Sequence, residues 1–319
     1  MKNWIFFAAS AALAGSAAAQ DCKLVRIEEW PVRLERNLPI IEGEINGKKV
    51  GILLDTGAER SVVTRSAATR LMLSRYDLAT SRMYGVGTDK PVEAVQIDEL
   101  RIGPAMRRNW SVQLAPEHDF GGEISLILGE DFFSAVDVEL DFPNRAVRLY
   151  QPKDCEGASL AYWATSGGGA GEVALQAGAK TVFTVSVNGR PMLALLDTGA
   201  PASALAGAEA ARLGVTTKST GVAIAGCSVG IGRKPVDYWS GPFESFAIGN
   251  EVIRNPTLRF GEVLTSTGPF VDVPRMVLGV DFLRAHRVYV ARSQRKLYFT
   301  YTGGTVFPME AAKGCQDLR

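Results

Sequence analysis

The chain has 319 residues, of which 46% are hydrophobic, and its formal net charge at pH 7 is +1. A chain of this length can bury two separate cores, and this balanced composition excludes a disordered or fibrous protein. There is no basic excess of the kind that nucleic-acid-binding proteins carry, so we expect no nucleic-acid partner.

The chain begins with the layout of a secretory signal peptide. A lysine at position 2 precedes an apolar run from Trp4 to Leu13, and small residues follow up to Ala19. A membrane anchor is the alternative, but the apolar run is about half of the roughly 20 residues that span a bilayer. We therefore expect residues 1–19 to be removed, leaving a periplasmic or secreted protein without a stable membrane anchor.

Each half of the chain opens with the same pattern. Stretches 39–45 and 181–187 alternate like strands, each runs into an Asn-Gly turn, and each turn leads to an Asp-Thr-Gly-Ala motif. The two motifs start at Asp55 and Asp197, a shift of 197 − 55 = 142 residues. This internal repeat predicts a duplicated unit in which a hairpin delivers each aspartate.

A second similarity lies farther along each half. Residues 127–133 resemble residues 277–283, and a strand-like segment follows each of them, at 146–150 and 296–300. The shift is now 150, which indicates insertions in the second half. Short alternating segments predict a mostly β protein, with helices few and short, after Gly57, Gly129, Gly199 and Gly279.

The stretch 165–171 has the glycine-rich composition of a linker and falls between the two copies. We therefore predict four parts of the chain. These are a signal peptide at 1–19, an N-terminal lobe at 20–164, a linker at 165–171 and a C-terminal lobe at 172–319.

Four cysteines remain after the predicted cleavage site, so export would allow two disulfides. Three pairings are possible. Cys22 and Cys155 bracket the first half, which favours that pair and leaves Cys227 with Cys315. The cysteine spacing does not fit a zinc site, and the two histidines have no second ligand at helical spacing, so we expect neither a metal nor another cofactor.

Two aspartates in matched flanks can work as one acid and one base. Carboxyl groups within hydrogen-bonding distance cannot both ionise, so Asp55 and Asp197 would share a proton at the same pH. The apolar runs before them predict buried strands that deliver the carboxyl groups rigidly. Peptide hydrolysis without a metal or a covalent nucleophile needs this pairing, and we predict that both aspartates are catalytic.

The residues after each aspartate should support the site. Gly57 and Gly199 permit a sharp turn and a close approach of the backbone. Thr56 and Thr198 carry hydroxyls that can donate hydrogen bonds across to the opposite half.

These motifs resemble the retropepsin-like branch of the pepsin and retroviral protease superfamily. The resemblance rests on the hydrophobic-hydrophobic-Asp-Thr-Gly-Ala motif and on the hydrophobic-hydrophobic-Gly segments at 127–129 and 277–279. It implies two homologous β-barrel lobes with an active-site cleft between them, and a polypeptide substrate. Since one chain carries both halves, it also implies a working monomer.

The resemblance assigns further roles. It implies that each later glycine segment passes beneath an Asp loop and that the threonine pair forms a grip between the lobes. It also implies that a flap tip covers the substrate, formed by Tyr84, Gly85, Val86 and Gly87.

The sequence departs from pepsin where Ala58 and Ala200 replace a hydroxyl residue. Without that hydrogen-bond donor the pKa values of the two aspartates should be higher, which predicts a pH optimum nearer neutrality than that of pepsin. Asp131 and Asp281 also recur between the halves, and we interpret them as helix N-caps. A catalytically silent peptide-binding or scaffold protein is the alternative function.

Overall fold

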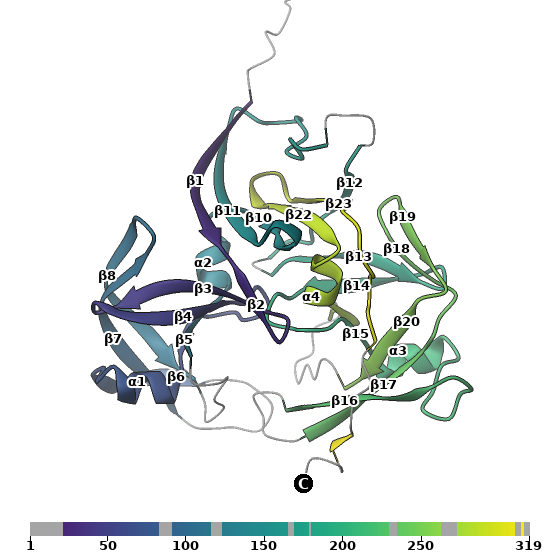
Figure 1. Ribbon diagram of the computed structural model, residues 1–319, viewed down its shortest axis with the longest axis horizontal. Helices are drawn as coiled ribbons and strands as arrows, with labels where there is room; N and C mark the ends of the chain where they lie inside the picture. The colour runs from purple at the N-terminus through teal and green to yellow at the C-terminus, as the bar shows by residue number, and fades with distance from the viewer. Residues whose placement is uncertain are drawn as a thin grey trace, which may run out of the picture.

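The computed structural model describes residues 22–82, 91–115, 123–164, 169–178, 180–229, 235–262, 273–309 and 314–315. The predicted signal peptide and the predicted flap tip, Tyr84 to Gly87, lie outside this range. Within it, no helix is long and apolar enough to cross a membrane. Strands dominate, as the sequence predicts, and they form three sheets (Figure 1).

The first sheet contains a closed ring of six strands. Its order is β2-β3-β4-β9-β5-β8-β7-β6, and an additional pairing of β3 with β7 closes the ring. The strands are β2 (Arg33–Glu35), β3 (Leu38–Ile45), β4 (Lys48–Leu54), β5 (Val62–Val63), β6 (Arg75–Arg82), β7 (Pro91–Ile102), β8 (Ala105–Leu114) and β9 (Ile124–Leu128).

The second sheet repeats this barrel. Its order is β16-β17-β20-β15-β21-β14-β13-β18-β19. The strands are β13 (Val182–Val187), β14 (Arg190–Leu196), β15 (Ala204–Ala206), β16 (Ala223–Val229), β17 (Pro235–Pro242), β18 (Ser245–Ile248), β19 (Glu251–Arg254), β20 (Thr257–Gly261) and β21 (Met276–Leu278).

Prolines explain why the second barrel has more, shorter strands. The long strands β7 and β8 of the first barrel correspond to β17 with β18 and to β19 with β20. Pro242 ends β17 and Pro256 separates β19 from β20. Because proline has no backbone N–H to donate, each interrupts the ladder without changing the path of the chain.

A third sheet joins the two halves. Its order is β1-β11-β10-β22-β23-β12, so three strands come from each half (Figure 1). At its centre β10 and β22 pair antiparallel, with Glu139 opposite Tyr289, its own counterpart at the shift of 150. The strands are β1 (Lys23–Pro31), β10 (Asp137–Asp141), β11 (Ala146–Lys153), β12 (Gly171–Ala174), β22 (His286–Ala291) and β23 (Lys296–Tyr301).

The local turns and helices follow the sequence patterns. At Asn46-Gly47 and Asn188-Gly189 all four φ angles are positive, between 49° and 73°, as the tight turn of a two-residue hairpin requires. The short helices are α1 (Arg65–Arg70), α2 (Glu130–Phe133), α3 (Gly207–Arg212), α4 (Val280–Leu283) and the 3-10 turns η1 (Phe142–Asn144) and η2 (Arg292–Gln294). Both predicted hairpins are confirmed.

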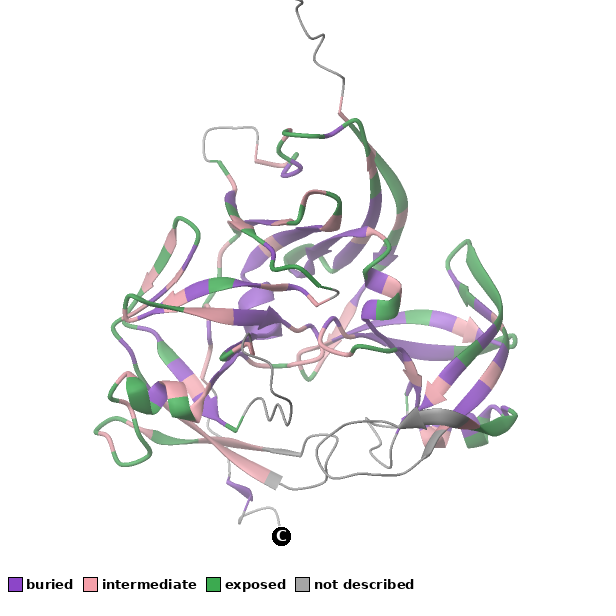
Figure 2. Cartoon of the chain, turned by 180° about the vertical axis from the view of Figure 1, so that it is seen from behind, coloured by how far each residue is buried: buried purple, intermediate pink, exposed green. Residues whose placement is uncertain are grey.

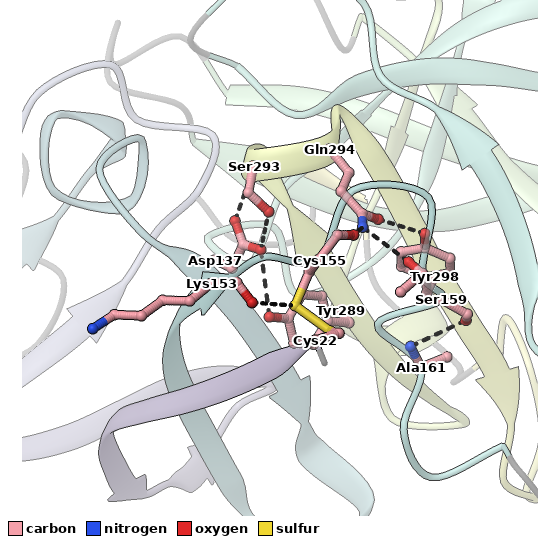
Figure 3. Close-up of a disulfide and its surroundings, with 11 residues drawn as sticks. Cys22, Asp137, Lys153, Cys155, Ser159, Ala161, Tyr289, Ser293, Gln294 and Tyr298 are labelled. Atoms are coloured by element: carbon pink, nitrogen blue, oxygen red, sulfur yellow. Dashed lines mark hydrogen bonds between the residues drawn. A yellow bond between two sulfur atoms is a disulfide. The ribbon is translucent and has the colours of Figure 1, made fainter. Parts of the chain in front are cut away.

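Buried residues occur along the strands of both barrels and of the shared sheet (Figure 2). The segment after β11 covers one face of that sheet, where Cys22 and Cys155 form a disulfide (Figure 3). The Gln294 side chain holds this segment by donating to the backbone oxygen of Cys155 at 2.6 Å. Cys227 and Cys315 form the second disulfide, between β16 and the C-terminal tail, so both favoured pairings are present.

Candidate active site

The two Asp loops begin where β4 and β14 end. The backbone N–H of Asp55 donates to the oxygen of Leu128 at 3.0 Å, and that of Asp197 donates to Leu278, also at 3.0 Å. The N–H groups of the residues after the later glycines, Glu130 and Val280, each donate back to an Asp loop at 2.9 Å. Each later glycine segment thus supports an Asp loop, as expected from the resemblance.

The two threonines tie the Asp loops together. The hydroxyl of Thr56 donates to the backbone oxygen of Leu196 at 2.8 Å, and that of Thr198 donates to the oxygen of Leu54 at 2.7 Å. Each hydroxyl also accepts the backbone N–H of the other threonine, at 3.0 and 3.1 Å. The expected grip between the lobes is therefore present as four reciprocal hydrogen bonds.

The glycines let the carboxyl groups meet. A Cβ added to Gly57 would overlap the carboxyl group of Asp197, and one added to Gly199 would overlap that of Asp55. Any larger residue at either position would push the aspartates apart. With glycine there, the carboxyl groups of Asp55 and Asp197 hydrogen-bond to each other.

The surroundings raise the pKa values of both aspartates. Burial raises the pKa of Asp197, and the negative charge of Asp55 raises it further. Burial also raises the pKa of Asp55, but the N–H groups of Gly57 and Ala58, each 2.9 Å from its Oδ1, and the charge of Lys180 counteract the increase. The environment thus favours the proton on Asp197 and the charge on Asp55.

The rise is in the direction that Ala58 and Ala200 led us to expect, but its main cause is burial. The backbone N–H groups of the two alanines act the other way and lower the pKa values.

Sequence reasoning missed a charged pair beside the dyad. Lys180 Nζ lies 3.1 Å from Glu59 Oε1, and this pair joins the segment before β13 to the first Asp loop. At the shift of 142, Lys180 corresponds to Leu38 in the first half, and Glu59 corresponds to Pro201 in the second half. The mismatch between the repeats was the available signal, since the four residues directly before Glu59, Asp55 to Ala58, are all matched.

A second missed cluster lies behind the first Asp loop. Glu130 is 1% exposed, and both of its carboxylate oxygens accept from Arg292 Nη2, at 2.6 and 2.7 Å. The same nitrogen donates to the hydroxyl of Thr181 at 2.7 Å. Burial raises the pKa of Glu130 to about 7, although Arg292 acts to lower it. This cluster joins the first barrel, the second barrel and the shared sheet.

The helix-cap prediction for Asp131 and Asp281 is wrong. The N-caps of α2 and α4 are Gly129 and Gly279, and the aspartates stand inside the helices. Their carboxylates instead accept the hydroxyl and the backbone N–H of Ser61 or Ser203, within 2.8 Å. The serine hydroxyls donate to the aspartates and accept the N–H groups of the two glycines, so each aspartate holds an Asp loop against its helix.

One group of three potential metal ligands occurs in the described part of the chain: Cys227, Asp237 and Cys315. Its two sulfurs are joined in a disulfide, and a Cys ligand to a metal must be a thiolate. Asp237 is also occupied, because its Oδ1 accepts the backbone N–H of Cys315 at 2.6 Å. This group anchors the C-terminal tail to β16 and β17.

Comparison with known families agrees with this geometry. The aspartyl protease family matches residues 41–132 and again residues 183–282. The two matches are the two barrels with their Asp loops, and together they cover more than half of the chain. A search of curated proteins finds no significant match. The chain, with its two copies of the matching unit, belongs to the aspartyl protease family.

Proposed function

We propose that this protein is an exported aspartic endopeptidase in which Asp55 and Asp197 together activate one water molecule. The observation that carries the proposal is the pair of hydrogen-bonded carboxyl groups where the two barrels meet. Both carboxyl groups are half-buried, and both loops are held by matching hydrogen bonds. Such a pair keeps one acid and one base at the same pH.

We assign a different role to each aspartate, and the asymmetry around the pair supports this assignment. Asp55, beside Lys180, takes a proton from water as the water oxygen bonds to the scissile carbonyl carbon. Asp197 gives its proton to the carbonyl oxygen, and a tetrahedral diol forms. When the C–N bond breaks, the proton on Asp55 passes to the leaving nitrogen, and a diol hydroxyl returns a proton to Asp197.

The remaining assignments complete the proposal. Thr56, Gly57, Ala58, Thr198, Gly199 and Ala200 support the two carboxyl groups, and Tyr84, Gly85, Val86 and Gly87 form the flap over an extended polypeptide substrate. The chain works as a monomer, because the fold supplies both halves of the site. Two disulfides suit an exported protein, which fits removal of residues 1–19.

The test is cleavage of a mixed peptide library by the mature protein. We expect new peptide termini that carry one oxygen atom from the solvent when the reaction runs in ¹⁸O-labelled water, and inhibition by a statine-type mimic of the diol. The Asp55→Asn variant is the matched control, since it keeps the shape of the side chain and removes the base. Binding of peptides without any cleavage would establish the catalytically silent alternative instead.

A further inference from the structure

Strand register places one row of side chains beside each aspartate. Alternate residues of a strand point to the same side of the sheet, as do residues opposite one another in neighbouring strands. Leu53 therefore shares its side with Asp55, and Leu195 with Asp197. The Asp55 face consists of Ile40, Leu53, Val62 and Ile127, and the Asp197 face consists of Val182, Leu195, Ala204 and Val277.

The two faces differ in size although they occupy equivalent positions. The second half has the smaller residue at three of the four positions, with valine for isoleucine twice and alanine for valine once. The Asp55 face forms a hydrophobic cluster of its own, to which Leu38 and Ala58 add their side chains. Of the Asp197 face, Leu195, Ala204 and Val277 are buried as well. The two faces thus differ in the size of their side chains, and those of the Asp197 face are the smaller set.

The faces also differ in polarity at their edges. Leu38 lies two residues before Ile40 and extends the apolar cluster of the Asp55 face. Its counterpart Lys180 lies two residues before Val182, and its side chain is 37% exposed. Lys180 pairs with Glu59, whose side chain is 76% exposed. A ligand that extends beyond the Asp197 face would meet a charged pair, whereas at the Asp55 face it would meet leucine.

This difference predicts a directional substrate preference, and the inference rests on the proposed peptidase function. A scissile bond between two symmetry-related aspartates places one flanking side chain near each face. We propose that the Asp55 face binds a small aliphatic side chain and that the Asp197 face binds a large one whose polar end reaches Lys180. The preferred substrate is thus a peptide bond between a residue such as alanine and a residue such as tyrosine.

The expected preference is measurable. One methylene group in an apolar pocket changes kcat/KM by about 10- to 200-fold. The two faces differ by more than one such group, so reversing the order of the two flanking residues should change kcat/KM at least about 10-fold. A hydrogen bond to the lysine charge should favour tyrosine over phenylalanine by about 10-fold.

The experiment compares two peptides that differ only in the order of the central pair, Ala-Tyr or Tyr-Ala. A third peptide has phenylalanine in place of tyrosine in whichever of the two is cleaved faster. The mature protein should cleave one order at least about 10-fold faster. Equal kcat/KM for both orders would overturn the inference while leaving the peptidase proposal intact. No cleavage of any peptide would overturn both.

Exchange variants test the residues named. Val62→Ala combined with Ala204→Val swaps the sizes of two counterparts and should reduce or invert the preference for order. Lys180→Leu changes a partly exposed side chain, so it should fold, and it should abolish the preference for tyrosine over phenylalanine. If Lys180→Leu prefers tyrosine over phenylalanine as strongly as the wild type, Lys180 does not bind the tyrosine hydroxyl. If the folded exchange variant keeps the wild-type preference for one order, the sizes of the two faces do not determine that preference.

Discussion

The two halves of this protein are nearly identical where their Asp loops meet and diverge within a few residues of that point. The threonine grip, the later glycine segments and the serine–aspartate bonds all occur twice. Glu130 and Lys180 occur once, with Val280 and Leu38 at the equivalent positions. Symmetry is kept where the two Asp loops contact each other, and it is lost where the charges around the two carboxyl groups differ.

The largest effect on stability should come from the unmatched cluster. Arg292→Met would leave the carboxylate of Glu130 buried without its cation, which should lower the free energy of unfolding by about 3–5 kcal/mol at pH 8. Urea denaturation measures this change. The double variant Glu130→Val with Arg292→Met removes both charges and should recover most of the loss. A loss below about 1 kcal/mol for the single variant would show that the pair is not a stabilising link between the halves.

Removing the hydroxyl of either threonine should lower the free energy of unfolding by the same amount. Thr56→Val and Thr198→Val each remove a buried hydroxyl that donates one hydrogen bond and accepts another. Each should cost about 1–3 kcal/mol, because backbone groups of the other loop lose their partners. Comparing the two variants by thermal and urea unfolding checks the symmetry. Costs that differ by more than about 1 kcal/mol would contradict it.

Removing the serine hydroxyl from the two serine–aspartate bonds should lower the free energy of unfolding by unequal amounts. Asp281 is 1% exposed, whereas Asp131 is exposed to solvent. When Ser203→Ala removes a donor, the buried carboxylate cannot turn to water, and the cost should be about 1–3 kcal/mol. Ser61→Ala should cost less, about 0.5–1 kcal/mol, because water can hydrogen-bond to the exposed carboxylate of Asp131. Equal costs would show that burial does not decide the difference.

The raised pKa of Asp197 predicts a smaller, pH-dependent effect. Because the folded protein holds this proton more tightly than the unfolded chain, its stability should fall as pH rises from about 4 towards neutrality. Asp197→Asn removes the titration, so between pH 5 and pH 8 its free energy of unfolding should fall less than that of the wild type, by at least about 1 kcal/mol. Parallel curves for the two proteins would show that the dyad does not hold an extra proton.

The sequence predicted the features that repeat. Asn-Gly turns, the Asp-Thr-Gly-Ala motifs and the later glycine segments stand at matched spacings, and local turn chemistry determines their conformations. The hairpins at β3–β4 and β13–β14 and the contact between the two Asp loops followed from these patterns. The first disulfide followed from the positions of Cys22 and Cys155 around the first half, which left Cys227 with Cys315.

The sequence could not predict contacts that depend on long-range register. The closing strands β11 and β23 read as parts of separate lobes, but they join a sheet that both halves build. Arg292 reaches Glu130 across 162 residues, and no local pattern relates the two. Asp131 resembled a helix cap because it stands two residues after Gly129 and opens an apolar turn. Only the position of Ser61 in space shows whose hydrogen bonds its carboxylate accepts.

The most direct test of the central claim, that Asp55 and Asp197 act as one unit, is the rate of peptide cleavage by Asp55→Asn, Asp197→Asn and the double variant. Each single variant should lose about 1,000-fold or more in kcat, and the double variant should be no slower than the slower single variant, because residues that act together are non-additive. A single variant that retains the wild-type rate, or a double variant whose loss is the product of the two single losses, would contradict the account.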